Sequence, residues 1–129
     1  MRQEIMNWWL QAQRDVLTAG HSLQSKDYYA CVFWCQQALE KGLKAMIMHT
    51  KRVSIRELSV HSLATLGVYA KVPQKFRLFL RNVSSEYYLS RYPDASEAVP
   101  YTLYNDADAR EILHQAQEVM QWLATHLDK

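Results

Sequence analysis

Apolar residues recur at helical spacing through nearly the whole first half of the chain. From Ile5 to Leu23 they stand alternately four and three residues apart, which is typical of a helix with one face on a core. A second series of this kind runs from Tyr28 to Ile47, and no proline interrupts residues 1–72. The sequence therefore predicts two long helices, and the short break between the two series makes them an antiparallel hairpin.

The second half of the chain predicts shorter helices and one long loop. Residues 58–70 carry a short helical pattern, and Val72-Pro73 opens a fourth helix, because proline is favoured in a first turn. The segment 91–104 has two prolines and three tyrosines but no helical stripe. It is predicted as a loop, and loops of that length are often functional. A last helical stripe follows Asn105, which is a suitable N-cap.

The pattern as a whole indicates one fold class. No segment alternates apolar and polar residues as a strand does, and no internal repeat is found. With 129 residues, 49% of them hydrophobic, the chain has the size of a single domain, residues 1–129, and enough apolar surface for a core. We predict an all-α protein, an up-and-down antiparallel bundle of four to five helices.

Two positions in the first hairpin carry local predictions. Asp27 immediately precedes the second helix and is a plausible N-cap. Gly42 lies in the interior of that helix, where glycine is less favourable than alanine by about 1 kcal/mol. This glycine suggests the close approach of another helix, with chance as the alternative.

The two cysteines and the terminal segment bear on location. Cys31 and Cys35 lie four residues apart on one helical face and are predicted to be buried free thiols of a reducing compartment. No stretch approaches the ~18 apolar residues of a membrane span, and the first residues have no signal-peptide core. We expect a cytoplasmic protein without membrane association, metal or cofactor.

The net charge of +2 conceals an uneven distribution. Residues 1–57 carry +3, residues 58–91 carry +4 and residues 92–129 carry −5. The basic excess includes a stripe with the order Arg77, Arg81, Tyr88 and Arg91. Guanidinium groups hold phosphates and aromatic rings stack on bases, so this stripe indicates a nucleotide or RNA contact. The alternative is a solvated face whose arginines pair with acids of the last helix.

Five short segments occur in the order known from one protein family. They are WLQAQRD at 9–15, QQALEKGLKA at 36–45, HSL at 61–63, YYLSRYPD at 87–94, and the group Tyr104, Asp106 and Ala107. Together they resemble the HEPN domain family (higher eukaryotes and prokaryotes nucleotide-binding), in particular its small stand-alone members of the RYPD type.

This resemblance implies a five-helix bundle that is usually a homodimer. It also implies pairing with a minimal nucleotidyltransferase in a toxin–antitoxin-like system, and binding of nucleotide or RNA phosphate. Arginines are then expected to hold phosphate and tyrosines to stack. The candidate contacts are Arg77, Arg81, Asn82, Tyr88, Arg91 and Tyr92.

The resemblance leaves open whether the protein is an enzyme. The ribonuclease branch uses an Arg-x4–6-His motif, and RNVSSEYY at 81–88 follows that frame with Glu86 at the histidine position. Histidine suits proton transfer near neutral pH, whereas a carboxylate needs a raised pKa, which neighbouring arginines oppose. A metal-independent ribonuclease with Arg81, Glu86 and Tyr88 as catalytic residues therefore stays an alternative, and so does a purely protein-binding module.

A second Arg-x4-His spacing joins Arg56 to His61. Its position differs from that of the ribonuclease motif, and His61 instead matches the HSL segment of the family. We expect His61 to cap or pack.

Overall fold

The computed structural model describes residues 1–84, 90–93 and 98–127. Within these ranges the chain forms five α-helices and no strand. The helices are α1 (Gln3–Gln24), α2 (Tyr28–Lys51), α3 (Leu63–Tyr69), α4 (Gln74–Ser84) and α7 (Asp106–Leu127). Two short 3-10 turns, η1 (Ile55–Glu57) and η2 (Pro100–Thr102), lie in the connections. The predicted all-α class is confirmed.

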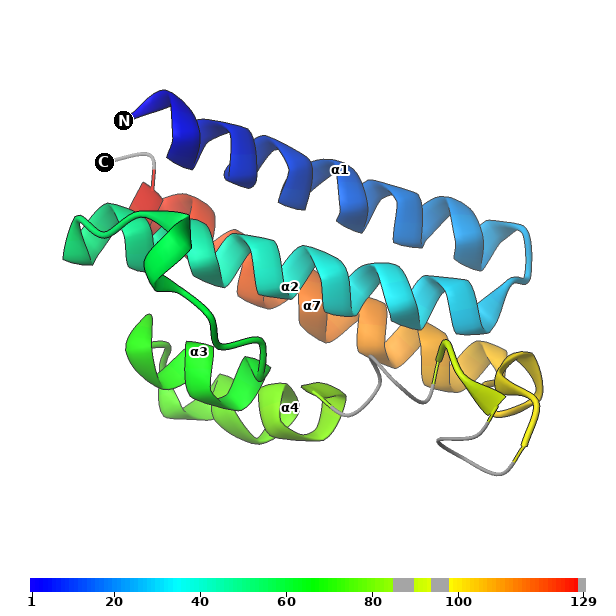
Figure 1. The fold of residues 1–129 in the computed structure, drawn as a ribbon. Helices are drawn as coiled ribbons and strands as arrows, with labels where there is room; N and C mark the ends of the chain where they lie inside the picture. The colour runs from blue at the N-terminus through cyan, green and yellow to red at the C-terminus, as the bar shows by residue number, and fades with distance from the viewer. Residues whose placement is uncertain (85–89, 94–97, 128–129) are drawn as a thin grey trace.

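The three long helices α1, α2 and α7 lie side by side, and the short pair α3 and α4 packs along one side of them (Figure 1). α1 and α2 form the predicted antiparallel hairpin, and α7 contacts both. Both chain ends lie at the same end of the bundle (Figure 1). Among the described residues, no helix has the length and apolar character needed to span a bilayer.

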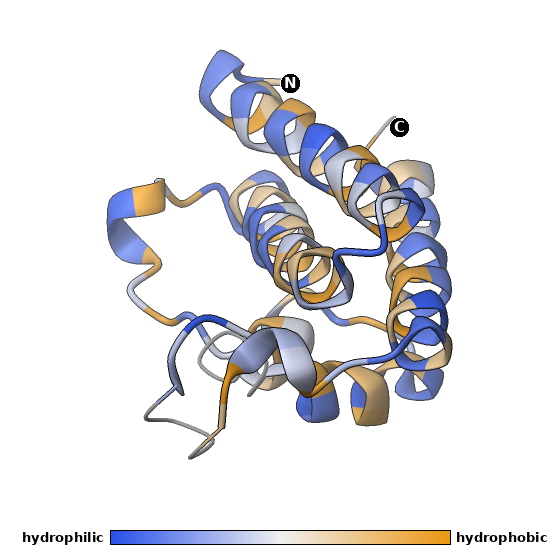
Figure 2. Cartoon of the chain, turned by 90° about the vertical axis from the view of Figure 1, so that its right-hand side faces the viewer, coloured by the Kyte–Doolittle hydropathy of each residue, from blue (hydrophilic) through white to orange (hydrophobic). Residues whose placement is uncertain are grey.

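α2 is the central element of the fold. Every residue from Gly42 to Met48 is buried, although the sequence predicted a single apolar stripe there. The additional burial arises because α1, α7 and α3 cover different sides of α2. In the end-on view of Figure 2 the hydrophobic sectors of the long helices turn toward the interior.

The connection from α2 to α3 differs from the predicted one. α3 begins at Leu63, so the expected helix at 58–70 was too long at its N-terminal end. Ser62 is extended and its hydroxyl accepts a hydrogen bond from the Thr65 amide at 3.5 Å, which stabilises a helix start at this point.

The two predicted N-caps have different outcomes. Asn105 Oδ1 accepts from the Asp108 amide at 2.8 Å, and the Asp108 carboxylate accepts from the Asn105 amide at 3.3 Å, so this cap is confirmed. Asp27 holds the N-cap position of α2 but makes no side-chain hydrogen bond there. Its capping role was therefore wrong, and the turn is held by backbone bonds such as Asp27 N to Ser22 O at 2.9 Å.

The close helix approach at Gly42 is confirmed. A Cβ at this position would lie 2.9 Å from Leu123 Cδ1 and 3.3 Å from Met120 Sδ, both on α7. Cys31 and Cys35, on the same helix, are buried free thiols, as predicted.

Candidate functional site

Two of the sequence-predicted contact residues, Asn82 and Arg91, line two different cavities. Arg77, Arg81 and Asn82 are exposed on α4, and Asn82 lines a cavity of about 370 Å³ between α4 and α7. Arg91 lines a separate cavity of about 440 Å³, which shares no described lining residue with the first. Tyr92 is exposed beside Arg91. Tyr88 and Glu86 lie outside the described residues.

The arginines of α4 are not neutralised by α7 within the described chain. Neither Arg77 nor Arg81 forms an ion pair there, and Arg77 Nε donates to the Val72 carbonyl at 3.4 Å. Two acids of α7 are engaged within their own helix: Asp106 pairs with Arg110 and Glu118 contacts His114.

The cavity at Arg91 lies at the turn between α1 and α2. Its walls are that turn, the first residues of α2 and parts of the segment from Ser90 to Tyr101. Its cations are Lys26 and Arg91, and its aromatic side chains are Tyr28, Tyr29 and Tyr101. Figure 1 shows the described parts of this later segment, residues 90–93 and 98–101, at the same end of the bundle as the α1–α2 turn.

Local structure positions both cations. Lys26 has φ 64°, in the left-handed region, where the chain reverses between α1 and α2. The Arg91 guanidinium lies over the Phe33 ring at 4.8 Å and over the Tyr92 ring at 5.5 Å. Cation–π contacts of this kind hold the guanidinium in place.

The described lining of this cavity carries more positive than negative charge, and a further acid, Asp106, lies near it. The Arg110 guanidinium, through its hydrogen bonds and its charge, lowers the pKa of Asp106, and the charge of Lys26 contributes to the same shift. Among the described lining residues of the cavity, Asp27 is the only acid, against the two cations Lys26 and Arg91. An open cavity with two cations and three tyrosines can hold a phosphate and stack a planar ring.

Only the second of the two catalytic hypotheses involves residues that the structure describes throughout. The set Arg81, Glu86 and Tyr88 depends on two residues outside the described ranges and stays a prediction. In the second Arg-x4-His pair, Arg56 is exposed in η1. His61 Nδ1 lies 2.9 Å from Lys44 Nζ and 3.3 Å from Glu40 Oε2, but its side chain is 71% exposed. The expected capping or packing role of His61 was therefore wrong: Ser62 caps α3, and His61 contacts charged residues of α2 at the surface.

The segment QQALEKGLKA builds a charged contact between α1 and α2. Asp15 of α1 is only 2% exposed and pairs with Lys41 at 2.7 Å, while Gln11 donates to the other Asp15 oxygen at 2.8 Å. Lys44, also buried, pairs with Glu40 at 3.1 Å. The polar residues of this segment therefore stabilise the helix pair.

Four lining residues of the cavity at Arg91 were not among the predicted contacts: Lys26, Tyr28, Tyr29 and Tyr101. Tyr28 was assigned to the apolar stripe of α2, and Lys26 was treated as part of a helix break. The available signal was a tyrosine pair directly after a turn that contains Lys26. In the described part of the chain, no cluster of three or more His, Cys, Asp or Glu side chains is arranged to hold a metal ion.

The fold and this cavity define a class: a small helical bundle with a cationic, tyrosine-lined pocket at one end. The family model of the HEPN domain matches residues 5–127. The chain thus belongs to the HEPN domain family.

Two solved structures resemble the chain over nearly its full length. TT1696 from Thermus thermophilus is 27% identical, with a TM-score of 0.85, over 97% of this chain and 99% of that one. ST0689, described as an archaeal HEPN homologue, is 26% identical, with a TM-score of 0.79, over 96% of this chain and 98% of that one. No curated protein matches the sequence.

Proposed function

We propose that this HEPN protein binds the phosphate of a nucleotide or of RNA in the cavity at the α1–α2 turn. The observation that carries the proposal is the meeting of Lys26 and Arg91 with three tyrosines around about 440 Å³ of open space. Arg91 is held between Phe33 and Tyr92 before any ligand arrives, which reduces the entropy lost on binding.

Each group in the cavity has a distinct role in this proposal. Arg91 and Lys26 hold the phosphate, and the exposed rings of Tyr29 and Tyr101 stack on the base. The exposed α4 residues Arg77, Arg81 and Asn82 do not line this cavity and would contact the backbone of a longer RNA. Tyr88 stays a predicted contact.

The test is fluorescence anisotropy with labelled ATP and with a labelled short RNA. Charge-assisted hydrogen bonds contribute about 1.5–3 kcal/mol, so Arg91→Gln and Lys26→Gln should each weaken both ligands about tenfold or more. Arg56→Gln removes an exposed charge in η1 and serves as the matched control, with an expected change below about twofold. Affinity should also fall as salt rises.

Arg81→Gln separates the two cation groups. It should weaken the RNA complex and leave ATP binding unchanged, because Arg81 does not line the cavity at Arg91. Unchanged affinity for both ligands in Arg91→Gln would overturn the proposal, and binding that does not respond to salt would favour the protein-binding alternative.

We further propose that the protein is a cytoplasmic homodimer and the partner of a minimal nucleotidyltransferase in a toxin–antitoxin-like pair. Membership of the HEPN family supports this, as do the exposed apolar side chains Leu10 and Leu17 on the outer face of α1. Light scattering measures the mass in solution, and co-purification with the candidate enzyme measures the pairing. A monomer that does not retain the enzyme would contradict this part of the proposal.

A further inference from the structure

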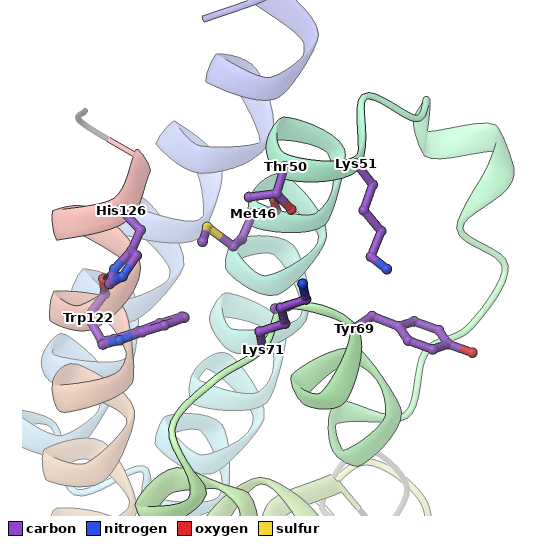
Figure 3. A pocket seen from close by; sticks show the side chains of 8 residues that line it. Met46, Thr50, Lys51, Tyr69, Lys71, Trp122 and His126 are labelled. Carbon is purple, nitrogen blue, oxygen red and sulfur yellow. Dashed lines mark hydrogen bonds between the residues drawn. The ribbon is translucent and has the colours of Figure 1, made fainter.

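A third cavity lies at the opposite end of α2 from the proposed phosphate site. It has a volume of about 350 Å³ and is enclosed by the C-terminal ends of α2, α3 and α7. Its side chains are Met46, Thr50, Lys51, Tyr69, Lys71, Trp122 and His126 (Figure 3).

The walls of this cavity are aromatic and apolar. Figure 3 shows Trp122 projecting from α7, with Met46 beside it and Tyr69 on the far flank. The His126 ring stacks on Trp122 with centroids 4.3 Å apart, and its Nδ1 lies 2.9 Å from the Trp122 carbonyl oxygen. The two rings of α7 therefore lie against each other, and both line the cavity.

Several carbonyls around the cavity accept hydrogen bonds from nearby groups of the same chain. Thr50 donates to the Met46 carbonyl at 3.0 Å, and Thr125 donates to the Trp122 carbonyl at 2.7 Å. At the end of α3, the amide of Lys71 donates to the Val68 carbonyl at 3.1 Å. Of these acceptors only the Val68 carbonyl belongs to the last turn of its helix, so the negative end of α3 is partly compensated without the lysine side chains.

Two ammonium groups remain available at this cavity. No acid stands among its described lining residues, and within the described chain neither Lys51 nor Lys71 forms an ion pair. Lys51 Nζ lies over the Tyr69 ring at 5.7 Å, and in Figure 3 Lys71 stands between Tyr69 and Trp122. The cavity therefore combines unpaired positive charge with a flat apolar wall.

We propose that this cavity is a second binding site, specific for a small aromatic carboxylate. The planar ring lies against Trp122 and Met46, and the carboxylate is held by Lys51 and Lys71. Lysine ammonium groups act as point charges and suit a single compact anion, whereas the arginine at the other end of the bundle suits a phosphate.

The test uses 2-naphthoate as the probe and follows the indole N–H signals of the ¹⁵N-labelled full chain by NMR. Titration should shift the Trp122 signal, assigned with Trp122→Phe, and leave the signal of Trp34 in place. The neutral analogue 2-naphthalenemethanol should bind about tenfold more weakly, because it has no charge for the lysines.

Lys71→Gly is the decisive variant, because it separates binding from folding. Lys71 has φ 59°, which glycine adopts without strain, so this variant should be at least as stable as the wild type in urea. It should nevertheless bind 2-naphthoate about fivefold more weakly, and Lys51→Gln should do the same. Arg91→Gln, in the other cavity, should bind 2-naphthoate as the wild type does, so the two sites are tested independently.

Three results would overturn the inference. They are wild-type affinity for 2-naphthoate in both lysine variants, equal binding of the neutral alcohol, and tighter binding of AMP than of 2-naphthoate at Trp122. The last result would make this cavity a nucleotide site instead.

Discussion

At the scale of single residues, two glycines in helix interiors distinguish the effect of packing on stability from the effect of helix propensity. Gly42 faces α7, where a Cβ would lie 2.9 Å from Leu123 Cδ1. Gly20 of α1 has nothing within 4 Å of the same point. Alanine would favour the helix by about 1 kcal/mol at both positions. Any difference between the free energies of unfolding of the two alanine variants therefore measures the contact with α7.

We predict that Gly20→Ala raises the free energy of unfolding by about 1 kcal/mol and that Gly42→Ala lowers it by about 1 kcal/mol. Gly42→Ala is expected to lower the free energy of unfolding because Leu123 is fully buried and has little room to move away from the added Cβ. Urea unfolding followed by circular dichroism measures both variants. Equal stabilisation by the two alanines would show that α7 yields without cost and would contradict this account of Gly42.

At the scale of helices, the charged contact between α1 and α2 is asymmetric. The Asp15 carboxylate is 2% exposed, whereas its partner Lys41 is 23% exposed and also donates to Gln37 at 3.3 Å. Loss of Lys41 leaves a buried charge with one amide donor from Gln11. Loss of the carboxylate leaves an ammonium group that reaches water.

Lys41→Met should therefore cost about 3 kcal/mol of stability and Asp15→Asn only about 1 kcal/mol, because an isolated buried charge is the more costly remnant. The same urea titration measures both, and the double variant reports how strongly the two side chains are coupled. The opposite order of the two single variants would show that Asp15 is hydrated in solution.

The helices themselves were predicted with different success. α1, α2 and α7 follow from apolar spacing, which is a local property of each segment, and the Asn105 cap involves only four consecutive residues. The start of α3 was misplaced by five residues, because the capping hydroxyl of Ser62 competes with a helical pattern that begins earlier. Short helices depend more on such caps than on their apolar face.

At the scale of the whole molecule, the two thiols report on the integrity of the bundle. Cys31 and Cys35 are both fully buried on α2. The hydrogen bond with Cys31, together with burial, holds the pKa of Cys35 well above its usual range. The hydrogen bond from Cys35 lowers the pKa of Cys31, but a reagent still cannot reach that sulfur in the folded bundle.

We predict that Ellman's reagent reacts slowly with the folded protein and rapidly with both thiols in guanidinium. Because access needs the long helices to separate, urea well below the unfolding midpoint should raise the reaction rate in step with the population of unfolded chain. A fast reaction of one thiol in native buffer, unaffected by urea, would instead reveal local opening near Cys31.

The candidate site was predictable only in part. Arg91 and Tyr92 stood out in the sequence because the RYPD segment includes both and the basic stripe ends at Arg91. Lys26, Tyr28 and Tyr29 lie far from them along the chain and join the cavity only because the later segment folds against the α1–α2 turn. The same holds for the cavity at Trp122, which brings together the ends of three helices.

The amino-acid sequence by itself determined the helical class, the long helices, the buried thiols and the family, since each depends on spacing or order along the chain. Tertiary structure alone decided that α2 is buried on all sides over Gly42 to Met48, that Asn82 of α4 and Arg91 line different cavities, and which tyrosines stand beside which cations. The physical reason is that helix periodicity arises from neighbours three and four residues apart. A pocket instead arises where segments distant along the chain leave space between them.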